Sequence, residues 1–442
     1  MGYHIIVVGA GIAGLAAANA LARKGNKVTV LESKPALNEF GASIGINPNG
    51  VRCLVKWGLE KKFESVVTKN GFTDIRDAAN NERLGRLAIN HKKYGTIKYG
   101  SEAWNIHRAD YQQTLAMGAI EMGATILFDA KCIRVDLERL AVILEDGREI
   151  AADLIVGADG MRSPVRHSIP VLASVEPKPL FEQTWRCTVP KDRMVGVPTL
   201  DWLLKNHDSM CWTTEGKYIL TWPMPPNRFY DVVCVVVRES TVPPGVWGTK
   251  ADPVKMKKNF QDLCPEVRDL LDRVDACVEW TQAELPPIDT FRSEDGRVVL
   301  MGDACHAMIP HSASGGNSAI EDAAVLAECI SWASDNGQPL SRATEAYEVL
   351  RKPRVQRMQT ASHEGYGFLG AGGDLRPIRD AGLAQQTKAL EAELNLSEEE
   401  RMQEKPANKD MKARFPSAPY LQWLYATDVT EEAKSYLAGL DK

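Results

Sequence analysis

The stretch YHIIVVGAGIAGLAAANALARKGNKVTVLES, residues 3–33, decides the fold. Its β-branched run HIIVV, at 4–8, predicts a short strand that is buried on both faces. The glycine turn GAGIAG, at 9–14, leads into the helix-forming run LAAANALARK, and Gly25 stands where a helix-ending glycine is expected. KVTVLE then predicts a second strand that ends at Glu32. A strand, a glycine turn, a helix and a strand in this order are typical of a dinucleotide-binding α/β fold.

The three glycines of this turn have separate physical roles in such a fold. Gly9 permits the tight turn, Gly11 lets the backbone approach a pyrophosphate, and Gly14 lets the helix pack closely on the strand. The pyrophosphate would lie at the positive end of the helix. Glu32 can accept hydrogen bonds from the hydroxyl groups of an adenosine ribose. We therefore expect dinucleotide binding rather than a purely structural turn, and the pattern by itself fits both FAD and NAD.

The composition excludes several classes of protein. The chain has 442 residues, of which 44% are apolar and 25% charged, and a net charge of −5 gives no general attraction to nucleic acid or anionic membranes. The nine cysteines form no C-x-x-C pair, which favours reduced thiols. No apolar run approaches the roughly 20 residues of a membrane-spanning helix. We expect a cytoplasmic protein, a monomer or homodimer, without nucleic-acid partners or a membrane span.

The remaining chain predicts two further glycine turns and a separate sheet. LIVGADG (154–160) and GRVVLMGDA (296–304) are expected strands that end in glycine turns, and NSAIEDAAVLAECISWA (317–333) is an expected helix. Between the two strands, QTWRCTV (183–189), YILTWPM (218–224) and YDVVCVVV (230–237) predict an antiparallel sheet. From about residue 340 the chain is expected to be helical.

The three glycine segments, GAGIAG near residue 10, GADGMRSPVR near 160 and GDACHAMIP near 304, resemble the ordered motifs of class A flavoprotein monooxygenases. This is the group of salicylate hydroxylase and p-hydroxybenzoate hydroxylase, and the chain is similar to its fungal natural-product members. The motifs cover about residues 1–340, and YLQWLYATD (420–428) resembles the closing motif of the family.

The resemblance implies an α/β fold with a Rossmann-like FAD-binding domain of the GR2 or p-hydroxybenzoate hydroxylase type. An antiparallel-sheet substrate domain would be inserted into it, and a helical segment would follow. The expected parts are residues 1–170 and 291–340 for the FAD-binding domain, 171–290 for the substrate sheet, and 341–442 for the C-terminal helical region.

The resemblance also implies roles for charged residues. Glu32 would bind the FAD ribose, and Arg108, in HRADY, would reach the phosphate region as a bidentate anion partner. Asp159 would touch both FAD and NAD(P)H, and Asp303 would hydrogen-bond the ribityl chain. The plain alternatives are a surface cation at a helix start for Arg108 and a turn residue for Asp159.

A proline-to-glycine stretch would carry the flavin ring. In the resembled family the backbone of P-x-x-x-x-G-G lies under the isoalloxazine, with a helix N-terminus facing the ring; Pro310, Gly315 and Gly316 match this pattern. Many members have Gln-Gly where this chain has Ser314-Gly315, so the contact of the Ser314 side chain is left open. The expected cofactor-binding set is Gly9, Gly11, Ala13, Gly14, Glu32, Ser33, Gly45, Arg108, Asp159, Asp303, Pro310, Gly315 and Gly316.

The implied reaction uses FAD with NAD(P)H and O2 as co-substrates. NAD(P)H reduces FAD, a C4a-hydroperoxyflavin forms, and one oxygen atom enters an electron-rich aromatic of phenol or indole type in secondary metabolism. Phenol-hydroxylating relatives use an Arg and a Tyr on neighbouring strands, which match Arg186 and Tyr218; His311 beside the flavin loop is a third catalytic candidate. Their alternatives are a rim salt bridge, core packing and a structural histidine. Trp185 and Trp222 are expected as walls of the substrate site.

Other activities remain open at this point. One is indole 2,3-epoxidation in an alkaloid pathway; others are a flavin oxidase or reductase, and a non-catalytic flavin- or NAD-binding regulator. Cys305 and His306 resemble a nucleophile pair, but adjacent residues of the expected strand would point to opposite faces. His306 and His311 lack further ligands at suitable spacing, so we expect no metal site.

Overall fold

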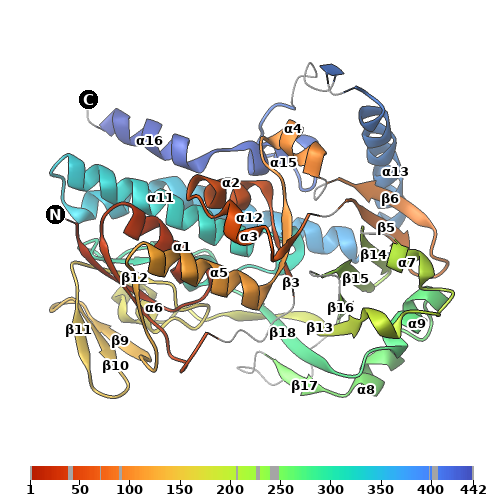
Figure 1. Ribbon diagram of the computed structural model, residues 1–442, viewed down its shortest axis with the longest axis horizontal. Coiled ribbons are helices and arrows are strands. Elements are labelled where there is room, and N and C mark those ends of the chain that lie inside the picture. The colour runs from red at the N-terminus through yellow and green to blue at the C-terminus, as the bar shows by residue number, and fades with distance from the viewer. Residues whose placement is uncertain are drawn as a thin grey trace.

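A five-stranded parallel sheet, in the order β19-β12-β1-β2-β8, carries the three glycine turns at the ends of its strands (Figure 1). The computed structural model describes residues 2–37, 43–69, 71–88, 92–205, 208–224, 229–238, 248–397, 399–400 and 407–440. The strands of this sheet are β1 (His4–Val8), β2 (Lys27–Leu31), β8 (Thr125–Leu127), β12 (Leu154–Gly157) and β19 (Val298–Leu300). The expected βαβ unit and the expected α/β fold are confirmed.

Four long helices pack against one another beside this sheet (Figure 1). Helix α1 packs against both α5 and α11, and α11 also packs against α12. Alanine fills much of α1, and the small side chains let the neighbouring helices approach closely. The chain leaves α1 through Gly25 at φ +81°, as the sequence predicts. The bounds of these helices are α1 (Ile12–Arg23), α5 (Arg108–Glu121), α11 (Gly315–Asp335) and α12 (Leu340–Leu369).

A second, eight-stranded sheet has the order β17-β18-β13-β16-β15-β14-β5-β6. It is antiparallel, as predicted, except that β14 pairs in parallel with β5. Strands β5 and β6 come from residues 73–87, outside the segment 171–290 in which the sheet was expected, and the division of the chain into domains stays a prediction. The strands are β5 (Thr73–Asp77), β6 (Arg83–Leu87), β13 (Lys178–Pro190), β14 (Ser209–Thr214), β15 (Lys217–Pro223), β16 (Phe229–Val236), β17 (Thr249–Ala251) and β18 (Cys277–Glu284).

Side-chain alternation gives this sheet two different faces. On the far face, Trp185, Trp212 and Tyr230 belong to a core with the helices α7 (Asp201–Lys205), α8 (Pro253–Lys258) and α9 (Pro265–Asp272). On the near face, Tyr218 packs with Val233, Val235 and Leu369, the last residue of α12. Trp185 lies 6.2 Å from Phe260, ring to ring, in the far core. The expectation that Trp185 is a wall of the substrate site is therefore wrong, because alternation turns it away from its neighbour Arg186.

The chain ends in helices, as expected from about residue 340. Helix α13 packs on β6, α15 packs on α2 and α4, and α16 packs on α11. No described helix is long and apolar enough to cross a membrane. The remaining elements are β3 (Ser43–Ile46), α2 (Pro48–Lys56), α3 (Glu60–Phe63), β4 (Val67–Thr68), α4 (Lys92–Tyr99), β7 (Trp104–His107), β9 (Cys132–Asp136), β10 (Ala141–Leu144), β11 (Glu149–Ala151), α6 (Pro164–Ser168), η1 (Pro170–Leu172), η2 (Lys191–Arg193), α10 (Asp303–His306), η3 (Pro310–Ser312), α13 (Leu375–Leu394), α15 (Ala418–Ala426) and α16 (Val429–Leu440).

Candidate active site

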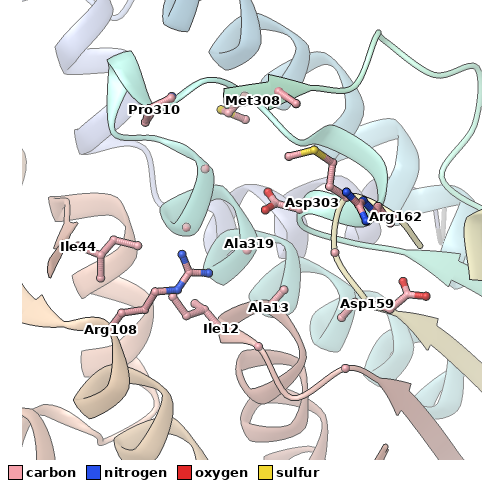
Figure 2. A pocket seen from close by; sticks show the side chains of 18 of the residues that line it. Ile12, Ala13, Ile44, Arg108, Asp159, Arg162, Asp303, Met308, Pro310 and Ala319 are labelled. Carbon is pink, nitrogen blue, oxygen red and sulfur yellow. The ribbon is translucent and has the colours of Figure 1, made fainter. Parts of the chain in front are cut away.

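A cleft of about 800 Å³ runs from the glycine turn after β1 to the near face of the eight-stranded sheet. Figure 2 shows Arg108, Asp303 and Pro310 around it, close to the first turns of α1 and α11. Every predicted cofactor-binding residue except Gly14 lines this cleft, and so does Arg186. Tyr218 and His311 are not part of its lining. The size is within the range of small-molecule and cofactor sites.

The glycine turn is shaped to leave space in the cleft at Gly11. A Cβ atom added to Gly11 would meet no heavy atom within 4 Å. Gly9 adopts φ +100°, a conformation that other residues rarely take. Gly14 serves packing instead, because its added Cβ would lie 1.9 Å from the carbonyl oxygen of Gly9. The open space at Gly11, next to the N-terminus of α1, fits the pyrophosphate of a dinucleotide.

Glu32 is held firmly at the end of β2. Its Oε2 accepts a hydrogen bond from the backbone N–H of Ala10 at 3.0 Å, and its Oε1 accepts from the N–H of Lys34 at 2.9 Å. The Ser33 hydroxyl also donates to Oε1, at 3.1 Å. Each carboxylate oxygen can accept more than one hydrogen bond, so Glu32 keeps capacity for a ribose hydroxyl.

Asp159 ends the second glycine segment with one carboxylate oxygen unsatisfied. Its Oδ2 accepts from the N–H of Val165 at 3.1 Å, whereas its buried Oδ1 has no hydrogen-bond partner among the described residues. Burial raises the pKa of this carboxyl to about 6. Arg162, labelled with Asp159 in Figure 2, lines the same cleft. Such an unsatisfied acceptor fits the expectation that Asp159 meets a ligand.

The loop that precedes α11, residues 310–314, contains a strained residue. Ala313 adopts φ +50°, in the left-handed region, and lines the cleft. The side-chain amides of Asn47 and Asn317 both donate to its carbonyl oxygen at 2.9 Å. These amides come from two separate segments, and the N–H of Asn47 in turn donates to Asn317 Oδ1 at 2.9 Å. The two asparagines therefore hold the loop in its turned shape.

The loop opens into α11 with its backbone toward the cleft. An added Cβ on Gly316 would lie 2.9 Å from Cδ1 of Ile44, so a side chain there would require the end of the Ile44 side chain to move. The Ser314 hydroxyl donates to the carbonyl of Ser312 at 3.0 Å and therefore turns back onto its own loop. The backbone at Gly315 and Gly316, not the side chain at 314, remains available to a flat ligand. This arrangement fits the predicted flavin contact.

Asp322 supports the turn that carries Asp303. Its Oδ2 accepts from the N–H of Gly302 at 3.0 Å and lies 2.6 Å from Nε2 of His306, and its Oδ1 accepts from Arg351 at 2.8 Å. Burial opposes ionisation of this carboxyl, but His306 and Arg351 outweigh it and lower its pKa to about 2. The ionised Asp322 thereby fixes the third glycine turn from behind.

Cys305 and His306 lie on α10, a helical turn, so the expected strand at these two residues is wrong. The chain turns directly after Gly302, whose φ is +59°. The Cys305 thiol lies 3.5 Å from the carbonyl oxygen of Gly302, and burial raises its pKa well above the ordinary value. His306 is engaged with Asp322. Among the described residues, no three His, Cys, Asp or Glu side chains gather as a metal site would require.

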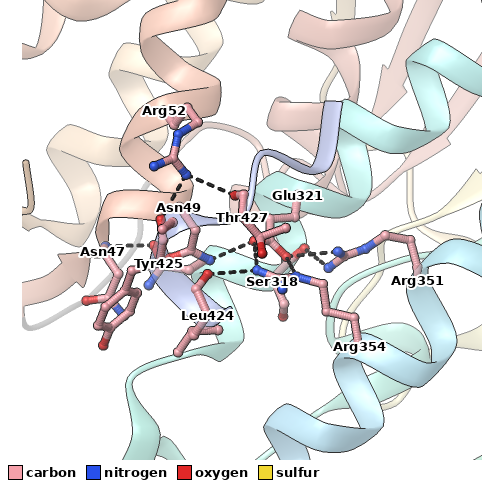
Figure 3. A network of polar contacts seen from close by, with 12 residues as sticks. Asn47, Asn49, Arg52, Ser318, Glu321, Arg351, Arg354, Leu424, Tyr425 and Thr427 are labelled. Atoms are coloured by element: carbon pink, nitrogen blue, oxygen red, sulfur yellow. Dashed lines mark hydrogen bonds and ion pairs between the residues drawn. The ribbon is translucent and has the colours of Figure 1, made fainter. Parts of the chain in front are cut away.

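A buried ionic network ties the closing motif to α11 (Figure 3). Arg351 and Arg354 of α12 both bind Glu321, at 2.8 and 2.7 Å. Arg354 also donates to the carbonyl oxygen of Leu424 at 2.8 Å. Arg52 of α2 donates to the carbonyl of Thr427 at 2.9 Å. The motif YLQWLYATD thus closes the structure behind α11 and does not reach the cleft.

Arg186 lines the cleft from β13 of the eight-stranded sheet, whereas Glu32 lines it from the end of β2 in the parallel sheet. The Arg186 guanidinium makes no hydrogen bond or ion pair with any residue in the described part of the chain. Burial lowers its pKa, while Asp231 on the neighbouring strand acts in the opposite direction. Asp231 itself accepts from the N–H and the hydroxyl of Ser43, at 2.9 and 2.7 Å. A half-buried arginine without a bonded partner is suited to an anionic or polar ligand.

Tyr218 and His311 meet behind the cleft wall, together with Glu182. The Tyr218 hydroxyl lies 3.0 Å from both Glu182 Oε1 and His311 Nε2. His311 Nε2 lies 2.9 Å from Glu182 Oε2, although without hydrogen-bond alignment. Burial raises the pKa of Glu182 to about 7 and lowers that of His311 to about 4. The sequence analysis missed Glu182, although its position four residues before Arg186 on one strand places both on the same face.

The sequence analysis also missed several residues of the cleft wall. They include Lys131, Cys132, Arg162, Trp280, Met308 and Asn317. Arg162 and Met308 lie in the glycine segments quoted above, whereas the segments of Lys131, Cys132 and Trp280 contain no such motif and reach the cleft only through the tertiary fold.

Comparisons with known proteins agree with this geometry. The family model described as "FAD binding domain" matches residues 2–362. The FAD-dependent monooxygenase OpS4 of Beauveria bassiana (strain ARSEF 2860) is 28% identical over 380 residues, covering 85% of this chain and 88% of the relative. The salicylate hydroxylase of Pseudomonas putida is 29% identical over 410 residues, covering 86% and 87%.

Solved structures support the same fold. The crystal structure of CtdE in complex with FAD and substrate 4 matches with a TM-score of 0.78 and 21% identity, and covers 99% of both chains. A salicylate hydroxylase substrate complex matches with a TM-score of 0.75 and 21% identity, and covers 99% of this chain and 98% of that chain. At this identity the likeness concerns the fold.

Proposed function

We propose, from the premise that this chain belongs to the FAD-dependent monooxygenase family, that it inserts one oxygen atom from O2 into an electron-rich aromatic molecule held at Arg186. A phenol-type substrate is the leading class, with NAD(P)H as a transient reductant, in secondary metabolism. The observation that carries this proposal is the guanidinium of Arg186, which has no bonded partner among the described residues and lines the same cleft as the glycine turn after β1.

The cleft offers a separate contact for each part of FAD. Glu32 would bind the adenosine ribose, and the backbone at Gly11 would face the pyrophosphate. Arg108 would add a positive charge on the phosphate side, and Asp303, which is exposed to the cleft, would accept from the ribityl hydroxyls. When bound, FAD supplies the redox chemistry that amino-acid side chains lack, including oxygen activation.

The loop at Gly315 and Gly316 would position the flavin ring. The first N–H groups of α11 have no partner inside the helix, and the positive end of the helix dipole favours negative charge on a ring placed there. Ala313, held by two amides, fixes the loop before the ligand arrives. Such preorganisation lowers the cost of placing a reactive ring in one orientation.

Arg186 would then orient and ionise the substrate. A guanidinium pairs well with a phenolate or carboxylate oxygen, and the pairing is stronger where water is excluded. A phenolate is more electron-rich than a phenol and so accepts an electrophilic oxygen more readily. Trp280 lines the same end of the cleft and can pack against an aromatic substrate.

Indole 2,3-epoxidation is the second candidate within the same fold. The Trp280 side chain would suit an indole, which needs orientation rather than ionisation. A panel of phenols and indoles separates the two: each compound is screened for stimulation of NADH and NADPH oxidation, and the products are identified by mass. A phenol whose mass increases by one oxygen atom supports phenol hydroxylation. An increase by one oxygen atom in the indoles alone supports indole epoxidation.

Two other classes predict different results in the same panel. A flavin oxidase or reductase would consume NAD(P)H and leave the aromatic compound unchanged. A non-catalytic flavin- or NAD-binding regulator would show no compound-dependent oxidation at all. If the purified protein is colourless and cannot be loaded with FAD, the proposal that it uses FAD is contradicted directly.

A further inference from the structure

Glu182 is a buried carboxyl for which the proposed reaction has so far no use. We propose that Glu182 is the internal proton acceptor of the site, and that it receives, through the hydroxyl of Tyr218 or Thr184, the proton that a phenolic substrate loses at Arg186. This inference rests on the proposed function and adds to it the route of the substrate proton. Glu182, Tyr218 and Thr184 are not part of the cleft lining, so the relay lies one layer behind the wall to which Arg186 and Trp280 belong.

Two hydroxyl groups converge on one oxygen of Glu182. The Tyr218 hydroxyl donates to Oε1 at 3.0 Å, and the Thr184 hydroxyl donates to the same atom at 3.3 Å. The other oxygen, Oε2, lies 2.9 Å from Nε2 of His311. The exposed fractions are 1% for Glu182, 1% for Thr184 and 3% for Tyr218, so the cluster is shielded from bulk water.

Strand geometry points this cluster toward the substrate end of the cleft. Glu182, Thr184 and Arg186 alternate along β13 and therefore share its near face. Thr184 stands opposite Trp280 on β18, and Trp280 lines the cleft. Pro310, the neighbour of His311, lines it as well. On this face of β13, Thr184 therefore stands between Arg186 and the buried carboxylate of Glu182.

The proton transfer balances without an added reactant. The O–H bond of the substrate breaks, its proton binds the Tyr218 or Thr184 oxygen, and the proton of that hydroxyl moves to Glu182. The net change is phenol plus carboxylate to phenolate plus carboxylic acid, with no electron transferred. One negative charge moves from a buried carboxylate to an oxygen beside the Arg186 guanidinium, where it is better stabilised.

The surroundings of Glu182 leave it able to exchange a proton near neutral pH. Burial raises its pKa to about 7, and the hydrogen bonds from Tyr218 and Thr184 oppose that rise. Burial, and then His363, lowers the pKa of His311 to about 4, so the imidazole is neutral at pH 7 and gives Glu182 no fixed counter-charge.

The groups that face this cluster come from four elements. They are Tyr218 from β15, His311 from η3, and Tyr366 and His363 from α12, with Glu284 of β18 next to His363 at 2.9 Å. None of these side chains carries a permanent positive charge. A general base of this kind works best when its pKa is near the working pH.

A proton count on substrate binding tests the inference. The holoprotein is titrated at pH 8 with phenol, 4-methylphenol and resorcinol by calorimetry in two buffers of different ionisation enthalpy, and bound phenolate is followed by difference absorption. The wild-type protein is expected to bind phenolate and release almost no proton to the buffer, because Glu182 retains it. Release of about one proton per bound phenolate by the wild-type protein would overturn the inference without any variant.

The variant pair is Glu182→Gln with Glu279→Gln as the matched control. Glu279 is also a buried glutamate, on the adjacent strand β18, but its Oε1 accepts from Gln183 at 2.7 Å on the far face of the sheet. Glu182→Gln is expected either to release about one more proton per phenolate or to bind neutral phenol. Its kcat/KM should fall about 100-fold and lose the rise through pH 7. Glu279→Gln should match the wild-type protein.

The outcomes separate this inference from the proposed function. If phenols are oxygenated and Glu182→Gln keeps the wild-type proton count and pH profile, the relay is wrong and the proposed function stands. If none of the three phenols binds to the yellow wild-type protein or stimulates its NAD(P)H oxidation, the phenol proposal fails and the relay fails with it. Tyr218→Phe and Thr184→Val then assign the route, because only the variant that lacks the conducting hydroxyl should reproduce the effect of Glu182→Gln.

Discussion

A Cβ atom added to Gly14 would lie 1.9 Å from the carbonyl oxygen of Gly9, whereas one added to Gly11 would meet nothing within 4 Å. The same turn therefore contains one glycine that packing requires and one that leaves space in the cleft. The N-terminus of α1 lies beside that space. Within six residues of sequence, Gly14 is thus required for packing, and Gly11 leaves the space in which a cofactor could bind.

Gly14→Ala and Gly11→Ala should therefore fail in different ways. Gly14→Ala should lower the free energy of unfolding by about 3 kcal/mol, because the methyl group meets fixed backbone. Gly11→Ala should leave the unfolding of the apoprotein unchanged and weaken FAD binding at least about tenfold, a loss of about 1.4 kcal/mol. Urea unfolding of both apoproteins and FAD titration check this. Normal FAD affinity in Gly11→Ala would show that the pyrophosphate does not lie there.

Asp322→Asn should destabilise the protein and loosen the third glycine turn. The substitution removes the carboxylate that binds His306 and one of the two that bind Arg351, which keeps Glu321, and this loss of buried ionic contacts costs about 3 kcal/mol in the free energy of unfolding. Because Asp322 holds the N–H of Gly302, the variant should also bind FAD more weakly. The matched control is Asp335→Asn, at the exposed end of the same helix, which should leave both quantities unchanged. Equal behaviour of the two variants would show that this ion pair does not support the turn.

The protein is expected to lose stability in acid, because Asp322 becomes protonated there. In the folded protein the pKa of Asp322 is lowered to about 2, below the roughly 3.9 of an unfolded chain. Because the pKa is lower in the folded protein, the ionised Asp322 contributes its full stabilisation above about pH 4. This contribution is lost as the pH falls toward 2. The shift corresponds to about 2.5 kcal/mol. Urea unfolding between pH 5 and 2.5 should show this loss in the wild-type protein and a smaller loss in Asp322→Asn.

The sequence predicted the parts of the fold that local patterns determine. The run from His4 to Leu31 gave a strand, a turn, a helix and a strand because its glycines and its apolar periods act over short distances. The near-face position of Arg186 also follows from alternation along a single strand. Even so, the apolar run up to Gly302 predicts a strand that continues to Cys305 and His306, where the structure has a helical turn.

Relationships between distant segments could not be predicted in the same way. The pairing of β5 with β14 joins residues more than a hundred positions apart, and no pattern in 73–77 indicates that partner. The meeting of Glu182 with Tyr218 and His311 depends on the sheet register and on the placement of η3. The clamp of Asn47 and Asn317 on Ala313 joins segments about 270 residues apart. Such contacts are properties of the assembled fold.

The most direct test of the central claim uses heavy-isotope O2 with the phenols and indoles of the panel. The FAD-loaded protein is incubated with NADH or NADPH, the test compound and labelled O2, and the products are weighed by mass spectrometry beside those of Arg186→Gln. The account predicts an aromatic product that carries one labelled oxygen from the wild-type protein. It predicts that Arg186→Gln still binds FAD but loses this product. Consumption of NAD(P)H without any labelled aromatic product, or an undiminished yield from Arg186→Gln, would contradict the account.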